Sequence, residues 1–241
     1  MKRNVLLVTL VLITGPLLAA DSGNEVKDAA RKLAEKGNYS WKTTTEAAGG
    51  GGGGRFRPGP TEGKTEKDGY TFLSMTRGDN TLEAVLKGGK GAIKTPNEGW
   101  KSLAEATADA GGGQGNPARF IGRMLQNFKA PAAQAEDLAG KAKELKSSEG
   151  AYSGDLTEEG AKSLLTFGRG RGGNAPEISG AKGSVKFWIT DGVLSKIQFN
   201  VQGKVSFNGN DRDVDRTTTI EIKDVGTTTV TVPDDAKKVL S

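Results

Sequence analysis

Residues 183–207 read GSVKFWITDGVLSKIQFNVQGKVSF, and apolar and polar side chains alternate along almost the whole stretch. Alternation with a period of two is typical of β-strands that bury one face. The Asp-Gly pair at 191–192 favours a tight turn between two such strands. A two-residue loop would set Thr190 opposite Val193, and apolar side chains would then face polar ones throughout. A three-residue loop, 190–192, pairs Ile189 with Val193 instead, so we predict that loop, with a bulge.

This register gathers seven apolar side chains on one face of the hairpin: Val185, Phe187, Ile189, Val193, Ile197, Phe199 and Val201. The opposite face is polar, apart from Trp188 and Leu194, which the same register places opposite each other. Two further strands are expected to extend the apolar face, one through Ile220 and Ile222 and one through Val230 and Val232. A sheet with one apolar face needs a cover.

The preceding part of the chain supplies candidate helices for that cover. A capping box, Ser22 with Glu25, predicts a helix start, and Asn116-Pro117 predicts another. Helices are expected at 22–36, 101–109, 117–128, 131–145 and 156–165, and a last helical turn at 233–240. Further strands are expected at 38–46, 70–77, 82–86 and 91–94. Helices and strands do not alternate regularly, so the fold class is α+β, with an antiparallel β-sheet covered on one face by several short helices.

The first residues have the layout of a secretory signal peptide. Lys2 and Arg3 precede a mainly apolar run at 5–18, and Ala19 and Ala20 suit a cleavage site. The run is shorter than a membrane-spanning helix and contains Gly15-Pro16. We therefore expect export to the periplasm or cell envelope, with cleavage near Ala20; a retained amino-terminal anchor is the alternative.

Residues 1–20 are thus expected to be a signal peptide, and residues 21–241 a single α+β domain. Two glycine-rich stretches, 49–60 and 168–176, are predicted to be flexible loops within it. Six consecutive glycines in the first of these lose much backbone entropy on ordering, and prolines do not fit a strand ladder. Once cleaved, the chain is not expected to span a membrane.

The composition limits the chemistry. There is no histidine and no cysteine among the 241 residues. The commonest general base, the commonest metal ligand and every Ser-His or Cys-His nucleophile are therefore absent. An enzyme would have to rely on carboxylates, lysine, tyrosine or a Ser-Lys pair, and no such set stands out. We expect a non-enzymatic protein with no catalytic residues and no cofactor.

Two weaker patterns concern metals and nucleic acids. Asp211, Asp213 and Asp215 stand at alternate positions, but Arg216 and Ile222 occupy places where a calcium loop of the EF-hand type needs Gly and Glu. We interpret residues 208–215 as a polar hairpin loop and expect no metal site. The chain has 34 basic and 29 acidic residues, and 32 basic residues without Lys2 and Arg3, so no nucleic-acid partner is expected.

Four segments, in order, resemble the extracytoplasmic lipoprotein-carrier-like superfamily, whose members include LolA, LppX and LprG. They are DGYTFLSM (68–75), AYSGDLTEEGAKSLL (151–165), GSVKFWITDGVLSKIQFNVQGKV (183–205) and TTTIEIKDVGTTTVTVP (217–233). The resemblance implies a curved antiparallel half-barrel with helices as a lid, and acyl chains held between them. The chain departs from the LppX type in lacking the lipid-attachment cysteine and in carrying a polyglycine stretch.

Together these observations lead to a binding function. We expect the protein to bind or carry a lipid or another apolar ligand between sheet and helices. The candidate wall residues are Trp41, Phe72, Phe187, Ile197, Phe199 and Val201. The alternative is a structural or interaction module of the cell envelope with a filled core, whose partner is an envelope protein. An enzyme would instead show a cleft with two acids of strongly shifted pKa.

Overall fold

The computed structural model describes residues 22–48, 59–67, 69–77, 80–95, 99–108, 117–166, 176–207 and 209–241. The predicted signal peptide and most of both glycine-rich stretches lie outside these residues, so the predictions made for them stay predictions. The domain boundaries likewise stay a prediction.

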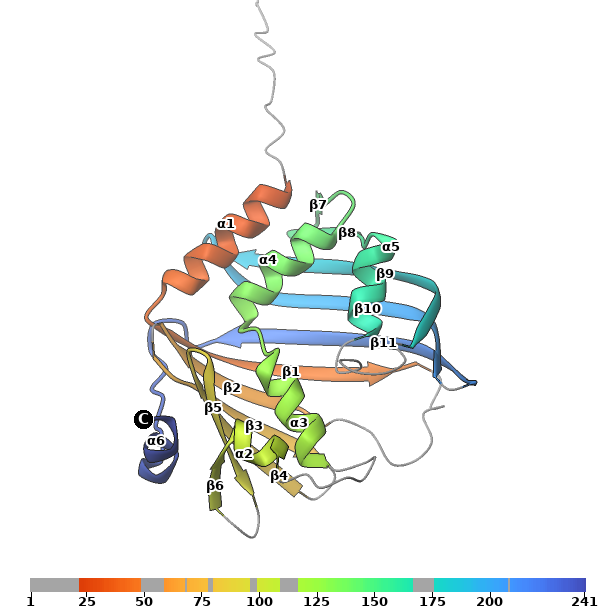
Figure 1. The fold of residues 1–241 in the computed structure, drawn as a ribbon. Coiled ribbons are helices and arrows are strands. Elements are labelled where there is room, and N and C mark those ends of the chain that lie inside the picture. Colours follow the sequence, from red (N-terminus) through yellow and green to blue (C-terminus); the bar gives the residue numbers. More distant parts are fainter. Residues whose placement is uncertain are drawn as a thin grey trace, which may run out of the picture.

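Eleven strands of the described chain form one antiparallel sheet (Figure 1). The strands are β1 (Asn38–Ala47), β2 (Thr61–Glu66), β3 (Thr71–Arg77), β4 (Asn80–Lys87), β5 (Lys90–Thr95), β6 (Gly99–Ser102), β7 (Lys146–Ser148), β8 (Ala151–Asp155), β9 (Glu177–Thr190), β10 (Val193–Phe207) and β11 (Asn210–Lys223). Their order is β6-β5-β4-β3-β2-β1-β11-β10-β9-β8-β7, so β1 and β11 join the two halves of the chain in the middle of the sheet.

The helices are α1 (Ser22–Glu35), α2 (Leu103–Ala108), α3 (Pro117–Gln126), α4 (Pro131–Lys141), α5 (Glu158–Leu165) and α6 (Asp234–Leu240). Helices α1, α4 and α5 lie over β9 and β10, and α2 and α3 lie near β5 (Figure 1). Helix α6 packs on β5 and β6. The α+β class and the open, curved antiparallel sheet with a cover of short helices are therefore confirmed.

The β9–β10 turn differs from the predicted one. Asp191 and Gly192 both have positive φ, 52° and 72°, as in a two-residue type I′ hairpin turn. Thr190 is therefore opposite Val193, and the predicted three-residue loop is wrong. The bulge lies within β10 instead: Ser195, two residues after Val193, has no partner in β9, and the register shifts there by one. The Ser195 hydroxyl donates to the Trp188 carbonyl oxygen at 3.1 Å.

The shifted bulge keeps most of the apolar face but changes its partners. Ile197 is opposite Phe187, and Phe199 is opposite Val185. Leu194 turns to the buried face and is 1% exposed, so the predicted Trp188–Leu194 pair is wrong.

Trp188 is instead opposite Lys196 on the other face. The ammonium groups of Lys186 and Lys196 lie 5.1 and 4.8 Å from its ring centroid.

Several other strands and helices differ from those predicted from the sequence. Strands β2, β6, β7 and β8 were not predicted. Val230 and Val232 lie outside any strand, because the chain after β11 leaves the sheet and leads to α6. Leu145 follows α4 instead of lying on it. Residues 210–215 belong to β11, not to a polar hairpin loop.

The main apolar cluster lies between the sheet and helices α1 to α5. Its central row runs across the strands: Thr43 is opposite Ile220, Ile220 opposite Ile197, and Ile197 opposite Phe187. Helix α1 buries Val26, Ala29, Ala30 and Leu33 against this face. The spacing of these four residues explains why α1 was predictable from the sequence.

A second, smaller apolar cluster joins α6 to the strands beneath it. Its buried members are Val85, Ala92, Val232, Ala236 and Leu240. Val85 is next to Ala84, which belongs to the main cluster, so the two clusters lie on opposite faces of the sheet. The Lys90 ammonium donates to the carbonyl oxygens of Leu240 and Ser241, at 3.3 and 3.1 Å, and holds the chain end there.

Phe187→Ala tests the central row. Phe187 is fully buried, so its truncation should lower the free energy of unfolding by about 3–5 kcal/mol. Trp188→Ala, one position along on the outer face, is the matched control and should cost clearly less. Urea unfolding measures both, and equal losses would contradict the assignment of the two faces.

Candidate functional site

The apolar interior brings together five of the six candidate wall residues. Phe187, Ile197 and Val201 are fully buried, Trp41 is 5% exposed and Phe199 is 6% exposed. All five belong to the main cluster. Phe72 does not, because it lies on the opposite face with Val85 in the second cluster.

Trp41 connects the sheet to the helical cover. Its indole lies over Gly63 of β2, at a place where any Cβ on residue 63 would collide with the ring. Its Nε1 donates to Thr65 Oγ1 at 3.2 Å. Its ring stacks on Phe128, with centroids 5.7 Å apart and 20° between the planes. Since Phe128 lies between α3 and α4, this stack joins the sheet to the link between two cover helices.

Tyr39 makes a second connection at the start of α4. It is 3% exposed, and its hydroxyl forms hydrogen bonds with the Ala132 backbone and the Thr65 side chain. Burial raises the pKa of Tyr39 to about 12, because the phenolate would lose its hydration. The sequence predicted a strand at 38–46 and singled out Trp41; Tyr39, two positions earlier in the same strand, shares its face.

Ion pairs stabilise the segment between α3 and α4. Asp137 accepts from Lys129 at 2.9 Å and from Lys141 at 2.7 Å. Burial acts to raise the pKa of Asp137, but the hydrogen bonds and charges of the two lysines outweigh it, and the pKa falls below its ordinary value. Lys129 precedes α4 and Lys141 is its last residue, so the two ion pairs of Asp137 connect the segment before the helix to the end of the helix.

Helix α1 is attached to the sheet by a polar contact near its start. Glu25, predicted for a capping box, forms a hydrogen bond with the Tyr152 hydroxyl of β8. That hydrogen bond, then burial and the carboxylate charge, raise the pKa of Tyr152. The cover is thus tied to the sheet by a few polar contacts around an apolar interior.

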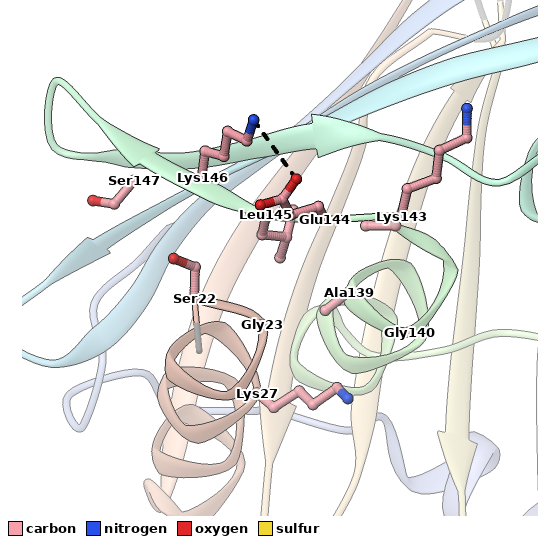
Figure 2. A pocket seen from close by; sticks show the side chains of 11 residues that line it. Ser22, Gly23, Lys27, Ala139, Gly140, Lys143, Glu144, Leu145, Lys146 and Ser147 are labelled. Carbon is pink, nitrogen blue, oxygen red and sulfur yellow. Dashed lines mark ion pairs between the residues drawn. The ribbon is translucent and has the colours of Figure 1, made fainter. Parts of the chain in front are cut away.

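A surface hollow of about 600 Å³ opens where α1 begins and α4 ends (Figure 2). It is lined by Ser22, Gly23, Lys27, Ala139, Gly140, Ala142, Lys143, Glu144, Leu145, Lys146 and Ser147. Ala139 and Leu145 also belong to the main apolar cluster. The hollow therefore combines a polar rim with a floor that borders the core.

A second hollow, of about 340 Å³, lies on the outer face of β8 to β11. It is lined mostly by polar side chains of both charges, among them Asp155, Lys186, Gln198 and Asn200. None of the five wall residues lines either hollow. Their side chains are packed against the helices instead.

The described titratable groups with shifted pKa values do not form an acid–base site. They are Tyr39, Asp137, Tyr152 and Glu158, whose pKa is lowered by its hydrogen bond to Lys162. None of the four lines either hollow. Within the described residues no group of three or more carboxylates is placed to hold a metal ion. In the same residues, no helix has the length and apolarity needed to cross a membrane.

Comparisons with known proteins return matches only among solved structures. No protein-family model matches the chain, and no curated protein matches it. The chain is similar in structure to LprF from Mycobacterium bovis, with 10% identity and a TM-score of 0.44, over 89% of this chain and 97% of LprF. It is also similar to the lipoprotein LppX from Mycobacterium tuberculosis, with 9% identity and a TM-score of 0.44, over 87% and 97%.

A third similar structure is a LolA superfamily protein from Nitrosomonas europaea, with 9% identity and a TM-score of 0.34, over 90% of this chain and 97% of that protein. At these identities the likeness concerns the fold alone.

Gly63→Ala tests the contact between sheet and link. The added Cβ would collide with the Trp41 indole, whose displacement should break the stack on Phe128. We expect a stability loss of about 1–3 kcal/mol and a changed near-ultraviolet circular dichroism spectrum. Gly89→Ala is the control, because a Cβ there meets nothing within 4 Å. An unchanged spectrum for Gly63→Ala would contradict the contact.

The pKa of Tyr39 predicts a loss of stability at high pH. The unfolded chain ionises this phenol near 10.0, whereas the folded chain keeps it neutral up to about 12. Its contribution is therefore complete below pH 10 and is lost as the pH rises to about 12, by roughly 2–3 kcal/mol. Urea unfolding of wild type and Tyr39→Phe should show their difference changing over this window. A constant difference would contradict the burial of the phenol.

Proposed function

We propose that this chain is an exported, non-enzymatic protein that binds a lipid or another apolar ligand between its sheet and its helices. The observation that carries the proposal is the continuous apolar face of β1 and β9 to β11, covered by separate short helices. Burial of an acyl chain there needs no reactive side chain, and each buried methylene contributes about 0.8 kcal/mol.

The wall is closed in the described structure, so a ligand would enter as cover helices move away from the sheet. Helix α4 suits such a movement, because it buries mainly small side chains: Ala132, Ala135 and Ala139 beside Leu138. Alanines expose less apolar area than leucines when a helix lifts, so the cost of opening is lower. The Trp41–Phe128 stack lies just before α4, so it would hold the start of the helix on the sheet while the rest of the helix moves away.

The full burial of the wall also favours a second function. Five wall residues with exposures of 0–6% are what a permanently filled core shows. In that case the protein is a structural or interaction module of the cell envelope, and its partner is an envelope protein. Export itself is proposed from the sequence of residues 1–20, and no nucleic-acid partner is proposed in either case.

Tryptophan quenching separates the two functions. Trp41 lies in the wall, Trp188 on the outer face and Trp100 against the second cluster. A variant that keeps only Trp41 (Trp100→Phe, Trp188→Phe) should lose most of its fluorescence when a brominated fatty acid binds. The matched variant that keeps only Trp188 (Trp41→Phe, Trp100→Phe) should be little affected.

Purified protein should also carry or take up lipid in native mass spectrometry. Absence of bound fatty acid, together with absence of quenching in both variants, would contradict ligand binding. Retention of an envelope protein without lipid would then support the interaction module.

A further inference from the structure

We infer that the hollow between the start of α1 and the end of α4 binds the anionic head group of the lipid, and that it is the entrance to the apolar interior. This inference rests on the proposed function and names its ligand class: a lipid with a carboxylate or phosphate head and an acyl tail. Three features of the hollow support it, namely the charge of its rim, its apolar floor and its size.

The rim of the hollow is basic. Lys27 comes from α1, Lys143 from the segment after α4, and Lys146 from β7, so three elements each contribute a lysine to the lining, and their ammonium groups lie apart from one another around it (Figure 2). Glu144 is the one acidic residue among those that line it. Glu144 lies 3.6 Å from Lys146, with both side chains about three-quarters exposed, so this pair is weak and easily rearranged.

Lys27 and Lys143 have no ion-pair partner within the part of the chain that the structure describes. The nearest acidic side chains along α1 are engaged elsewhere: Glu25 with Tyr152, and Asp28 with Arg31 at 2.8 Å. An anionic group at the rim would therefore gain attraction from the lysines without displacing a strong internal salt bridge.

The floor of the hollow is apolar and continuous with the core. Ala139 and Leu145 are each 8% exposed, while Leu138 next to them is fully buried. These side chains come from α4 and from the segment that follows it, and α1 packs against α4 at the same end. A head group at the lysines would leave its tail over Ala139 and Leu145, where it can enter between helix and sheet.

The size and the mixed lining of the hollow fit an amphiphile. Its volume of about 600 Å³ falls within the range of small-molecule sites, about 300–1,000 Å³. The hollow on the outer face of β8 to β11 does not share this charge, because Asp155 and Lys186 balance there, although Val185 of the main cluster is also among its lining residues. The two hollows therefore differ in charge.

The test compares an acid with its uncharged ester. Hexadecanoic acid and methyl hexadecanoate share one tail, so the ratio of their affinities isolates the head group. Wild type should prefer the acid, and the triple variant Lys27→Gln, Lys143→Gln, Lys146→Gln should bind the acid about tenfold more weakly, as expected for three exposed ion pairs. Its affinity for the ester should stay unchanged.

The matched control is the triple variant Lys36→Gln, Lys64→Gln, Lys182→Gln. These lysines are exposed, lie away from the hollow and change the net charge by the same amount. This variant should keep the wild-type preference for the acid. Equal weakening in both triple variants would show an effect of net charge alone and would overturn the inference.

The remaining outcomes separate this inference from the proposed function. Equal affinity of wild type for acid and ester would overturn the entrance while leaving lipid binding intact. Absence of binding for both ligands would overturn the proposed function and the entrance with it. Acetate or inorganic phosphate binding as tightly as the acid would identify a free-anion site, and would overturn assignment to a lipid head group.

Discussion

Burial of one apolar sheet face is the constraint on which the rest of the structure depends. The row Ile220, Ile197 and Phe187 crosses three strands at 0–1% exposure, and each side chain rests on a cross-strand neighbour. Such a face is stable only when another layer removes it from water. The chain provides that layer with five short helices from three separate segments, which is why so much of the sequence between the strands is helical.

The sequence predicted the apolar face and most of the cover, because alternation and helical spacing follow directly from which side is buried. It did not predict the position of the bulge. A glycine-containing turn signals a hairpin, but the predicted three-residue loop and the observed bulge at Ser195 put the same residues on the apolar face further along and differ only in their cross-strand partners. Only the positive φ of both Asp191 and Gly192 decides between them.

Other misses have physical causes of the same kind. Strand β2 reads TEGKTE and has no apolar period, since its central position is the glycine on which the Trp41 indole rests. Strand β7 is exposed at every residue. Phe72 and Leu73 are adjacent and both apolar, so the sequence does not show which of the two faces the main cluster. In the structure Phe72 faces the other side of the sheet, where it packs against the cluster that includes α6. The burial of five of the six candidate wall residues was predictable, whereas the contacts of Tyr39 and Phe128 and the basic hollow depend on segments that are distant in the sequence.

The cover differs from the sheet in how it is attached. The strands are held by a ladder of backbone hydrogen bonds, whereas the helices are held by buried apolar side chains and a few polar contacts. Among those contacts are Tyr39 with Ala132, Glu25 with Tyr152, and the Arg216 guanidinium, which donates to the Leu164 carbonyl oxygen of α5. Regions with few buried contacts open at lower free energy than the core, so the proposed entry of a ligand would proceed by movement of the cover and not of the sheet.

Amide hydrogen exchange distinguishes a cover that opens from a core that is permanently filled. If the cover opens, α4 and the segment before it should exchange through local opening, at clearly lower free energy than β9 to β11, and bound fatty acid should slow exchange in α4. Exchange of helices and strands together, at the free energy of global unfolding and unchanged by fatty acid, would show a permanently filled core and rule out entry between sheet and helices.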